Sequence, residues 1–161
     1  WLPIFISPEP IEIVVDNLKF CITEKSLQVH AYVVMPNHMH LIVSDETFDN
    51  ERLQKTLTGF RKFTGHKLAG YIDRALLISL STVTRNSASD DRSRQVWKPG
   101  WHAEAIASEQ FLVQKANYIH ENPVRKGLVR SAEDWVHSSA CYWTNGESAE
   151  IPIAPIVISH M

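Results

Sequence analysis

The chain has 161 residues, of which 44% are hydrophobic and 21% are charged, and its formal net charge is −2. This length suffices for one domain with a buried core, and the composition is that of a globular protein. The slightly acidic balance excludes binding of nucleic acid or membranes through global positive charge, so such binding would need a local basic patch. Cys21 and Cys141 form no CxxC pair, which favours free thiols. No apolar run has the length of a membrane span, and we expect a cytoplasmic protein.

The N-terminal half predicts a helix, a hairpin and a second helix. Apolar residues at helical spacing predict the first helix over residues 11–25. Residues 27–43 predict an antiparallel hairpin that turns at Pro36-Asn37, because proline fixes its own φ and asparagine tolerates the second turn position. Residues 49–70 predict a second helix, whose outer face carries a concentration of basic side chains. These are Lys55, Arg61, Lys62, His66 and Lys67.

The C-terminal half predicts a loop, a strand and a third helix. Residues 79–94 are serine-rich and show no periodicity, which is typical of a flexible loop. Residues 95–107 predict a strand or a hairpin. Ser108 is a suitable N-cap for the next helix, which must end near Asn122 because Pro123 follows it. The order of these elements favours an α+β fold, with a ferredoxin-like antiparallel sheet and helices packed on one face, in a single domain that spans the whole chain.

Two histidines interrupt the otherwise apolar second strand of the hairpin. Because side chains alternate across a strand, His38, His40 and Ile42 share one face, while Met39 and Leu41 take the other. Two imidazoles at this spacing converge toward one point. The pattern indicates a metal-binding or phosphate-binding site that needs a third partner.

The third helix offers that partner. Tyr118 and Asn122 stand four residues apart, so they are neighbours on one helical face. A tyrosine phenol is a feasible nucleophile where a divalent cation polarises a phosphoryl oxygen. Two imidazoles and one amide oxygen could hold such a cation and leave positions open for substrate. Imidazole is compatible with manganese and zinc, whereas sites made only of oxygen favour magnesium.

Two segments together carry a family resemblance: "MPNHMHLIV" at 35–43 and "YIHENPVRKGLV" at 118–129. In this order they resemble the single-tyrosine transposases with a His-hydrophobic-His (HUH) motif, of the insertion-sequence 200/605 type. The branch of REP-associated tyrosine transposases is the most similar. The resemblance covers nearly the whole chain and includes "WKPGWHAEAI" ahead of the tyrosine helix. It implies a ferredoxin-like fold, usually as a homodimer, and DNA transposition on single-stranded DNA that bears hairpins.

The resemblance also implies a role for each site residue. His38 and His40 match the metal-binding histidines, and the cation would be Mg or Mn. Tyr118 matches the nucleophile that becomes joined to the 5′ end of the cut DNA. Asn122 matches the third polar ligand. The family has a first strand upstream of "WLPIF", which we expect to be missing or shortened here.

The residues expected to contact DNA are basic side chains and one histidine. They are Arg61, Lys62, Lys67, His102, Lys115 and Arg125. Two alternatives remain open. The first is a zinc hydrolase that uses His38, His40 and His102 and needs neither the tyrosine nor DNA. The second is a domesticated DNA-binding protein that keeps the fold but does not cleave.

Overall fold

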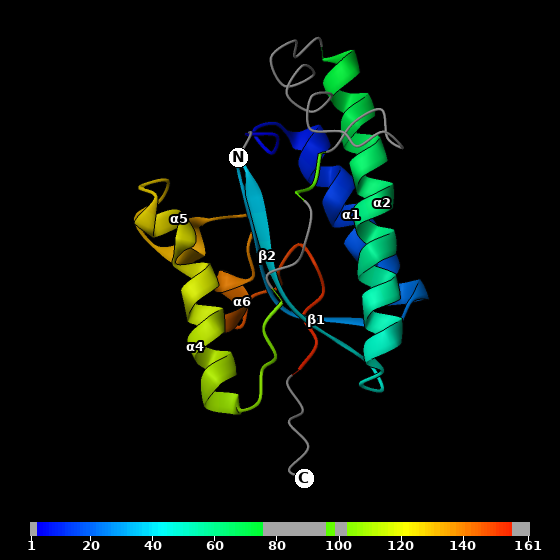
Figure 1. The fold of residues 1–161 in the computed structure, drawn as a ribbon. Helices are drawn as coiled ribbons and strands as arrows, with labels where there is room; N and C mark the ends of the chain where they lie inside the picture. The colour runs from blue at the N-terminus through cyan, green and yellow to red at the C-terminus, as the bar shows by residue number, and fades with distance from the viewer. Residues whose placement is uncertain (1–2, 76–95, 99–102, 156–161) are drawn as a thin grey trace.

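The computed structural model describes residues 3–75, 96–98 and 103–155, in which helices surround a hairpin (Figure 1). Among the described residues the sheet has two antiparallel strands, which confirms the expected α+β class. No helix of these residues is long and apolar enough to cross a membrane. In chain order the elements are α1 (Pro8–Glu24), β1 (Leu27–Met35), β2 (His38–Asp45), α2 (Asn50–Arg74), α4 (Glu109–His120), α5 (Asn122–Arg125), the 3-10 turn η1 (Ala132–Asp134) and α6 (Ala140–Asn145).

The hairpin forms where the sequence predicts it and turns at Pro36-Asn37. Its register places Met35 opposite His38 and Val33 opposite His40, with one irregularity between Val29 and Ala31. That bulge absorbs His30, whose ring bonds Ser44 Oγ through Nε2 at 2.9 Å. The two-residue turn and the bulge together fix the register, and with it the face on which each side chain of β2 lies.

Helices cover both faces of the hairpin. One face packs against α1 and α2, and the other packs against Leu112, Ala116 and Ile119 of α4. Figure 1 shows α1 and α2 on one side of the strands and α4 on the opposite side. The sequence predicts helices on one face only, so the second helical layer is a correction to that prediction. The physical reason for the second layer lies in β1, which is apolar at almost every position and so needs cover on both sides.

Helices α1 and α2 begin close to where the sequence predicts, and their buried residues recur at helical spacing. Helix α1 starts at Pro8, three residues before the expected start, because proline is tolerated in the first turn of a helix. Asp49 caps α2 by accepting a hydrogen bond from Arg52 N at 3.0 Å. Leu57, Phe60 and Leu68 of α2 are buried, and Leu53 is partly buried.

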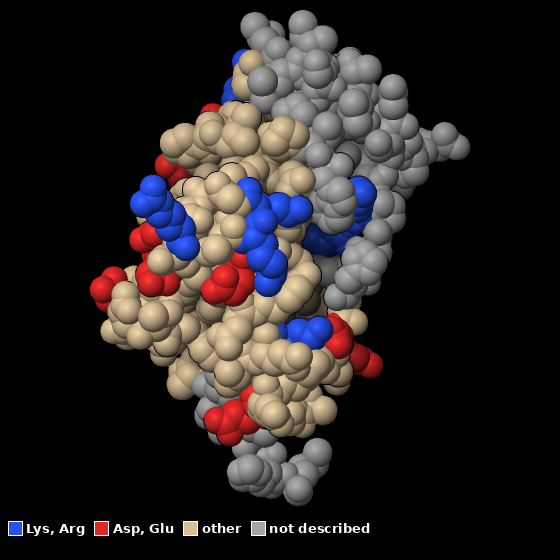
Figure 2. All heavy atoms as spheres, turned by 90° about the vertical axis from the view of Figure 1, so that its left-hand side faces the viewer, with Lys and Arg blue, Asp and Glu red and all other residues tan. Residues whose placement is uncertain are grey.

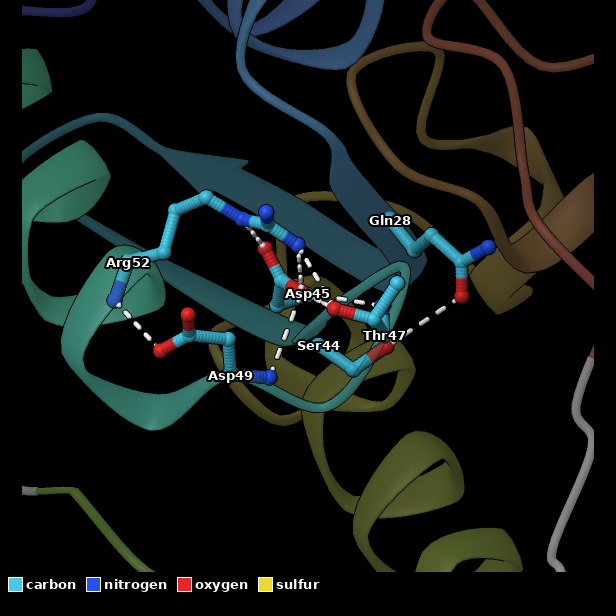
Figure 3. A network of polar contacts seen from close by, with 6 residues as sticks. All are labelled: Gln28, Ser44, Asp45, Thr47, Asp49 and Arg52. Carbon is cyan, nitrogen blue, oxygen red and sulfur yellow. Dashed lines mark hydrogen bonds and ion pairs between the residues drawn. The ribbon is translucent and has the colours of Figure 1, made fainter.

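A buried carboxylate ties the end of β2 to the start of α2 (Figure 3). Asp45 is 2% exposed and accepts hydrogen bonds from Arg52 Nε and Nη2, each at 2.5 Å. It also accepts from Thr47 N at 2.9 Å and from Asp49 N at 3.2 Å. The Arg52 hydrogen bonds hold the pKa of the Asp45 carboxyl well below its usual range. The network therefore fixes the position of the C-terminal end of β2, the strand that carries the histidines, relative to α2.

The C-terminal segments secure the outer edge of β1. Val34 N donates to His137 O at 2.8 Å, and Tyr32 N donates to Ser139 Oγ at 2.9 Å. Ser139 Oγ also bonds His120 Nε2 at 2.8 Å, so the end of α4 is tied to the same strand. These bonds satisfy the buried backbone N–H groups of β1 that do not pair with β2.

The expected strand around residues 95–107 is not found in its described parts, 96–98 and 103–107, which have no regular structure. Trp97 instead fills a space over α2, where its Nε1 donates to Thr64 Oγ1 at 2.9 Å and its ring lies 5.9 Å from that of Phe5. Because the Trp97 indole packs against the core, this segment follows the surface of α2 and does not pair as a strand. The serine-rich stretch 79–94 lies outside the described residues.

Candidate active site

The two histidines of β2 lie side by side on the α4 face of the hairpin. Their ring centroids are 4.9 Å apart and their planes meet at 86°. Ile42, the next residue on that face, packs into the cluster formed with α4, while Met39 and Leu41 pack toward α1 and α2. The alternation predicted from the sequence is therefore confirmed.

The turn residue Asn37 fixes the proton position on His38. Asn37 Oδ1 lies 2.7 Å from His38 Nδ1, and because an amide oxygen can only accept, the ring nitrogen must carry the proton. The lone pair of that imidazole is then on Nε2. Histidines that bind metals commonly donate their other ring N–H to an oxygen in this way.

Both imidazoles are held neutral. Burial, with smaller contributions from the nearby His38 and Arg125, lowers the pKa of His40 to about 4. Burial, then the charge of Lys126, lowers the pKa of His38. A neutral imidazole is the form that binds a metal ion. The same effects show that the cationic side chains of Arg125 and Lys126 lie close to the histidine pair.

Tyr118 of α4 faces the histidine pair across the site. Its ring centroid is 6.4 Å from that of His40, with an angle of 76° between the planes, and its side chain is 54% exposed. Helix α4 begins at its predicted N-cap, Ser108, whose Oγ accepts from Phe111 N at 3.2 Å. Tyr118 and His40, which are 78 positions apart in the sequence, thus come together at an open surface.

Asn122 lies just after the end of the tyrosine helix and bonds its last carbonyls. Helix α4 ends at His120, and the buried Asn122 opens the short helix α5. Its Nδ2 donates to the carbonyl oxygens of Tyr118 and Ile119, each at 3.2 Å, so the amide caps the last turn of α4. Because carbonyls can only accept, the amide nitrogen must face them, and Oδ1 remains as an acceptor for another group.

The donor set suits a divalent cation of the manganese or magnesium type. It offers two neutral imidazoles next to an exposed phenol, and the Asn122 amide lies on the backbone of the same tyrosine. Within the described residues, no group of three or more His, Cys, Asp or Glu side chains comes together. The alternative site with three histidines depends on His102, which lies outside the described residues.

The residues expected to contact DNA fall into separate groups. Arg125 stacks on the Tyr118 ring, with its Cζ 4.5 Å from the ring centroid. Lys115 is on the same helix as Tyr118, but its Nζ lies 2.5 Å from Glu104 Oε2, which offsets its charge. Figure 2 shows Lys and Arg side chains gathered in the upper half of this face, among Asp and Glu side chains.

The three basic residues of α2 are not part of this site. Arg61, Lys62 and Lys67 belong to the helix that packs on the opposite face of the hairpin (Figure 1). Arg61 Nη2 donates to Lys98 O, and the Nζ of Lys67 lies 5.6 Å from the ring centroid of the exposed Phe63. A DNA strand at Tyr118 would have to extend around the molecule to reach them.

Two features of the site are not predicted by the sequence. Asn37 was assigned only to the turn, although its place directly before His38 is a signal that it could orient that ring. The sequence predicts the end of the tyrosine helix near Asn122, close to the observed end at His120, but not the short helix α5 that brings Arg125 onto Tyr118. Comparisons with protein-family models, curated proteins and solved structures find no match to this chain. The functional interpretation therefore rests on the site residues and on the resemblance of the two segments that carry them.

Proposed function

We propose that the protein is a divalent-cation-dependent endonuclease and strand transferase for single-stranded DNA, with Tyr118 as its nucleophile. The observation that carries this proposal is the placement of the Tyr118 ring 6.4 Å from His40, which itself lies 4.9 Å from His38. An exposed phenol beside two neutral imidazoles suits an attack on a phosphodiester. The resemblance of both segments to single-tyrosine HUH transposases supports the same chemistry.

In the proposed reaction, the phenolic oxygen of Tyr118 forms a bond to a backbone phosphorus of the DNA. The bond from that phosphorus to the 3′ oxygen of the preceding nucleotide breaks, and this oxygen leaves as a hydroxyl after taking up a proton. The phenolic proton passes to solvent. The strand is then held as a 5′-phosphotyrosine, which a second 3′ hydroxyl attacks in the reverse step to rejoin DNA, as transposition requires.

The residues that would hold the cation are His38 through Nε2, His40 through its imidazole and Asn122 through Oδ1. Bound there, Mg²⁺ or Mn²⁺ would supply Lewis-acid polarisation of the phosphoryl oxygen. The chain itself keeps both imidazoles neutral and fixes the orientation of His38 through Asn37. It also anchors the Asn122 amide on the backbone of the nucleophile.

The proposed substrate is a single strand that bears a hairpin, and the proposed assembly is a homodimer, both on the strength of the resemblance. The net charge of −2 means that affinity for DNA must come from local groups. Arg125 is the basic residue of the expected set that lies against the nucleophile. The α2 group would bind a more distant part of the same strand.

The test is covalent capture of DNA. The protein is incubated with Mn²⁺ and a pool of hairpin oligonucleotides whose single-stranded flanks are randomised, and the mixture is denatured and separated by size. A label at the 3′ end should remain on the protein, whereas a label at the 5′ end should leave with the released strand. Sequencing the DNA bound to protein would identify the cleavage site.

Tyr118→Phe should bind the selected DNA with unchanged affinity and form no adduct, because only the nucleophilic oxygen is removed. Tyr142→Phe is the matched control, since Tyr142 is also exposed but lies on α6. An adduct that persists in Tyr118→Phe would assign the nucleophile elsewhere. DNA binding without any adduct in the unmodified protein would favour the domesticated, non-cleaving alternative, and bound zinc with hydrolysis independent of Tyr118 would favour the hydrolase.

A further inference from the structure

Arg125 makes two contacts with a single residue, and that residue is Tyr118. Its guanidinium lies over the phenol ring at 4.5 Å from the centroid, and its Nη2 lies 2.5 Å from the Tyr118 carbonyl oxygen. The break at Glu121 makes this possible, because α5 runs on for only one turn after Asn122. Gly127, at a φ of 67°, then ends that turn.

These contacts matter because Tyr118 is otherwise weakly held. The side chain is 54% exposed, and the other ring contact it makes in the described residues is with His40, at 6.4 Å. An exposed tyrosine normally exchanges between rotamers. A planar guanidinium stacked on the ring, with a hydrogen bond to the same residue's backbone, restricts that exchange. Lysine offers neither the planar stack nor the fixed fork of donors.

We propose that Arg125 is a positioning residue, which holds the phenol of Tyr118 toward the histidine pair before DNA binds. This inference rests on the proposed function of Tyr118 and adds a role that differs from contact with DNA phosphates. Asn122 Nδ2 donates to the same Tyr118 carbonyl at 3.2 Å. Helix α5 therefore contacts both the backbone of Tyr118 and its ring.

The first test observes the tyrosine without DNA. The chain has four tyrosines, so protein made with 3-fluorotyrosine should give four ¹⁹F resonances, and Tyr118→Phe identifies the relevant one. Arg125→Gln should shift and narrow the Tyr118 resonance, because the stack is lost and the ring moves more freely. Lys126→Gln is the control, since it removes the adjacent positive charge but makes no ring contact with Tyr118. An unmoved Tyr118 resonance in Arg125→Gln would overturn the proposal.

The second test separates positioning from DNA binding. With saturating hairpin DNA, Arg125→Gln should form the covalent adduct about ten- to a hundredfold more slowly, the order of effect expected for a misplaced reacting group. Arg125→Lys should recover DNA affinity but not this rate. Full recovery of the rate by lysine, or a loss of affinity alone in Arg125→Gln, would make Arg125 a phosphate contact only. If the unmodified protein forms no adduct, the proposed function fails, while the ¹⁹F measurement still decides whether Arg125 orients the ring.

Discussion

At the scale of single residues, the candidate site depends on small polar groups that orient larger ones. Asn37 orients His38, Asn122 holds the backbone of Tyr118, and Arg125 stacks on its ring. None of these three contacts involves an ionised acidic group.

His38→Ala and His40→Ala should each abolish binding of Mn²⁺ while leaving the stability of the protein nearly unchanged, because both side chains are only partly buried. Asn37→Ala should weaken Mn²⁺ binding by about 10- to 100-fold, since it removes the group that orients His38. Calorimetric titration measures all three, with His66→Ala on the exposed face of α2 as the control. Unaltered Mn²⁺ binding in both histidine variants would show that the cation site lies elsewhere.

Part of this site follows from the sequence alone. The alternation of a strand places His38 and His40 on one face, and helical spacing places Tyr118 near Asn122. That the strand and the helix meet depends on long-range packing, and only the resemblance to a family pointed to it. The hydrogen bond that His38 donates to Asn37 and the stacking of Arg125 on Tyr118 depend on local rotamers and on the short helix α5, which have no periodic signal.

At the scale of elements, the Asp45 network is the clearest link between the sheet and a helix. It joins the last residue of β2 to the first turn of α2 through Arg52, Thr47 and the backbone of Asp49 (Figure 3). Because the carboxylate is 2% exposed, its removal would leave several donors without an acceptor.

Asp45→Asn should lower the free energy of unfolding by about 1–3 kcal/mol at neutral pH. The folded pKa of Asp45 is depressed below its ordinary value of 3.8, so its stabilisation is present above that value and is lost as the pH falls through the folded pKa. The difference between Asp45→Asn and the unmodified protein should therefore shrink in acid. Urea unfolding from pH 7 down to about pH 3 measures this, with Asp16→Asn on the surface of α1 as the control. A difference that stays constant with pH would contradict this role.

The elements are predicted well where hydrophobic periodicity is strong. They are predicted poorly where a side chain packs against an element far away in the sequence. The hairpin and the helices that became α1, α2 and α4 follow from alternation, helical spacing and capping residues. Trp97 and its neighbours were expected in a strand, but the indole packs on α2 instead. The helix on the second face of the hairpin is needed because β1 is apolar on both faces. The prediction of a sheet covered on one face did not take this into account.

At the scale of the whole molecule, the hairpin separates the candidate site from the basic face of α2. The histidine pair faces α4, whereas Arg61, Lys62 and Lys67 belong to the helix on the other side. The contribution of α2 to DNA binding should therefore depend on the length of the DNA.

Replacing Arg61, Lys62 and Lys67 with Gln should flatten the slope of log affinity against log salt by about two units on a long hairpin substrate, because each lost phosphate contact removes about 0.7–0.9. On a single strand of about eight nucleotides, a typical site size for one binding groove, the slope should stay the same. Fluorescence anisotropy over a salt series measures both. If the triple variant leaves the slope unchanged on the long hairpin as well, α2 faces away from the DNA.

The two-residue turn and the bulge at His30 have a consequence for how this site is encoded. Side chains alternate along β2, so even-numbered residues face α4 and odd-numbered residues face α1 and α2. A slip of the hairpin by one residue would exchange the two sets, so the imidazoles would be buried against α1 and α2 and Met39 would face the tyrosine. The protein would contain the same residues and nearly the same fold, but no site. The site therefore exists only in this register of the hairpin. The turn at Pro36-Asn37 fixes the register at one end of β2, and the Asp45 network fixes it at the other.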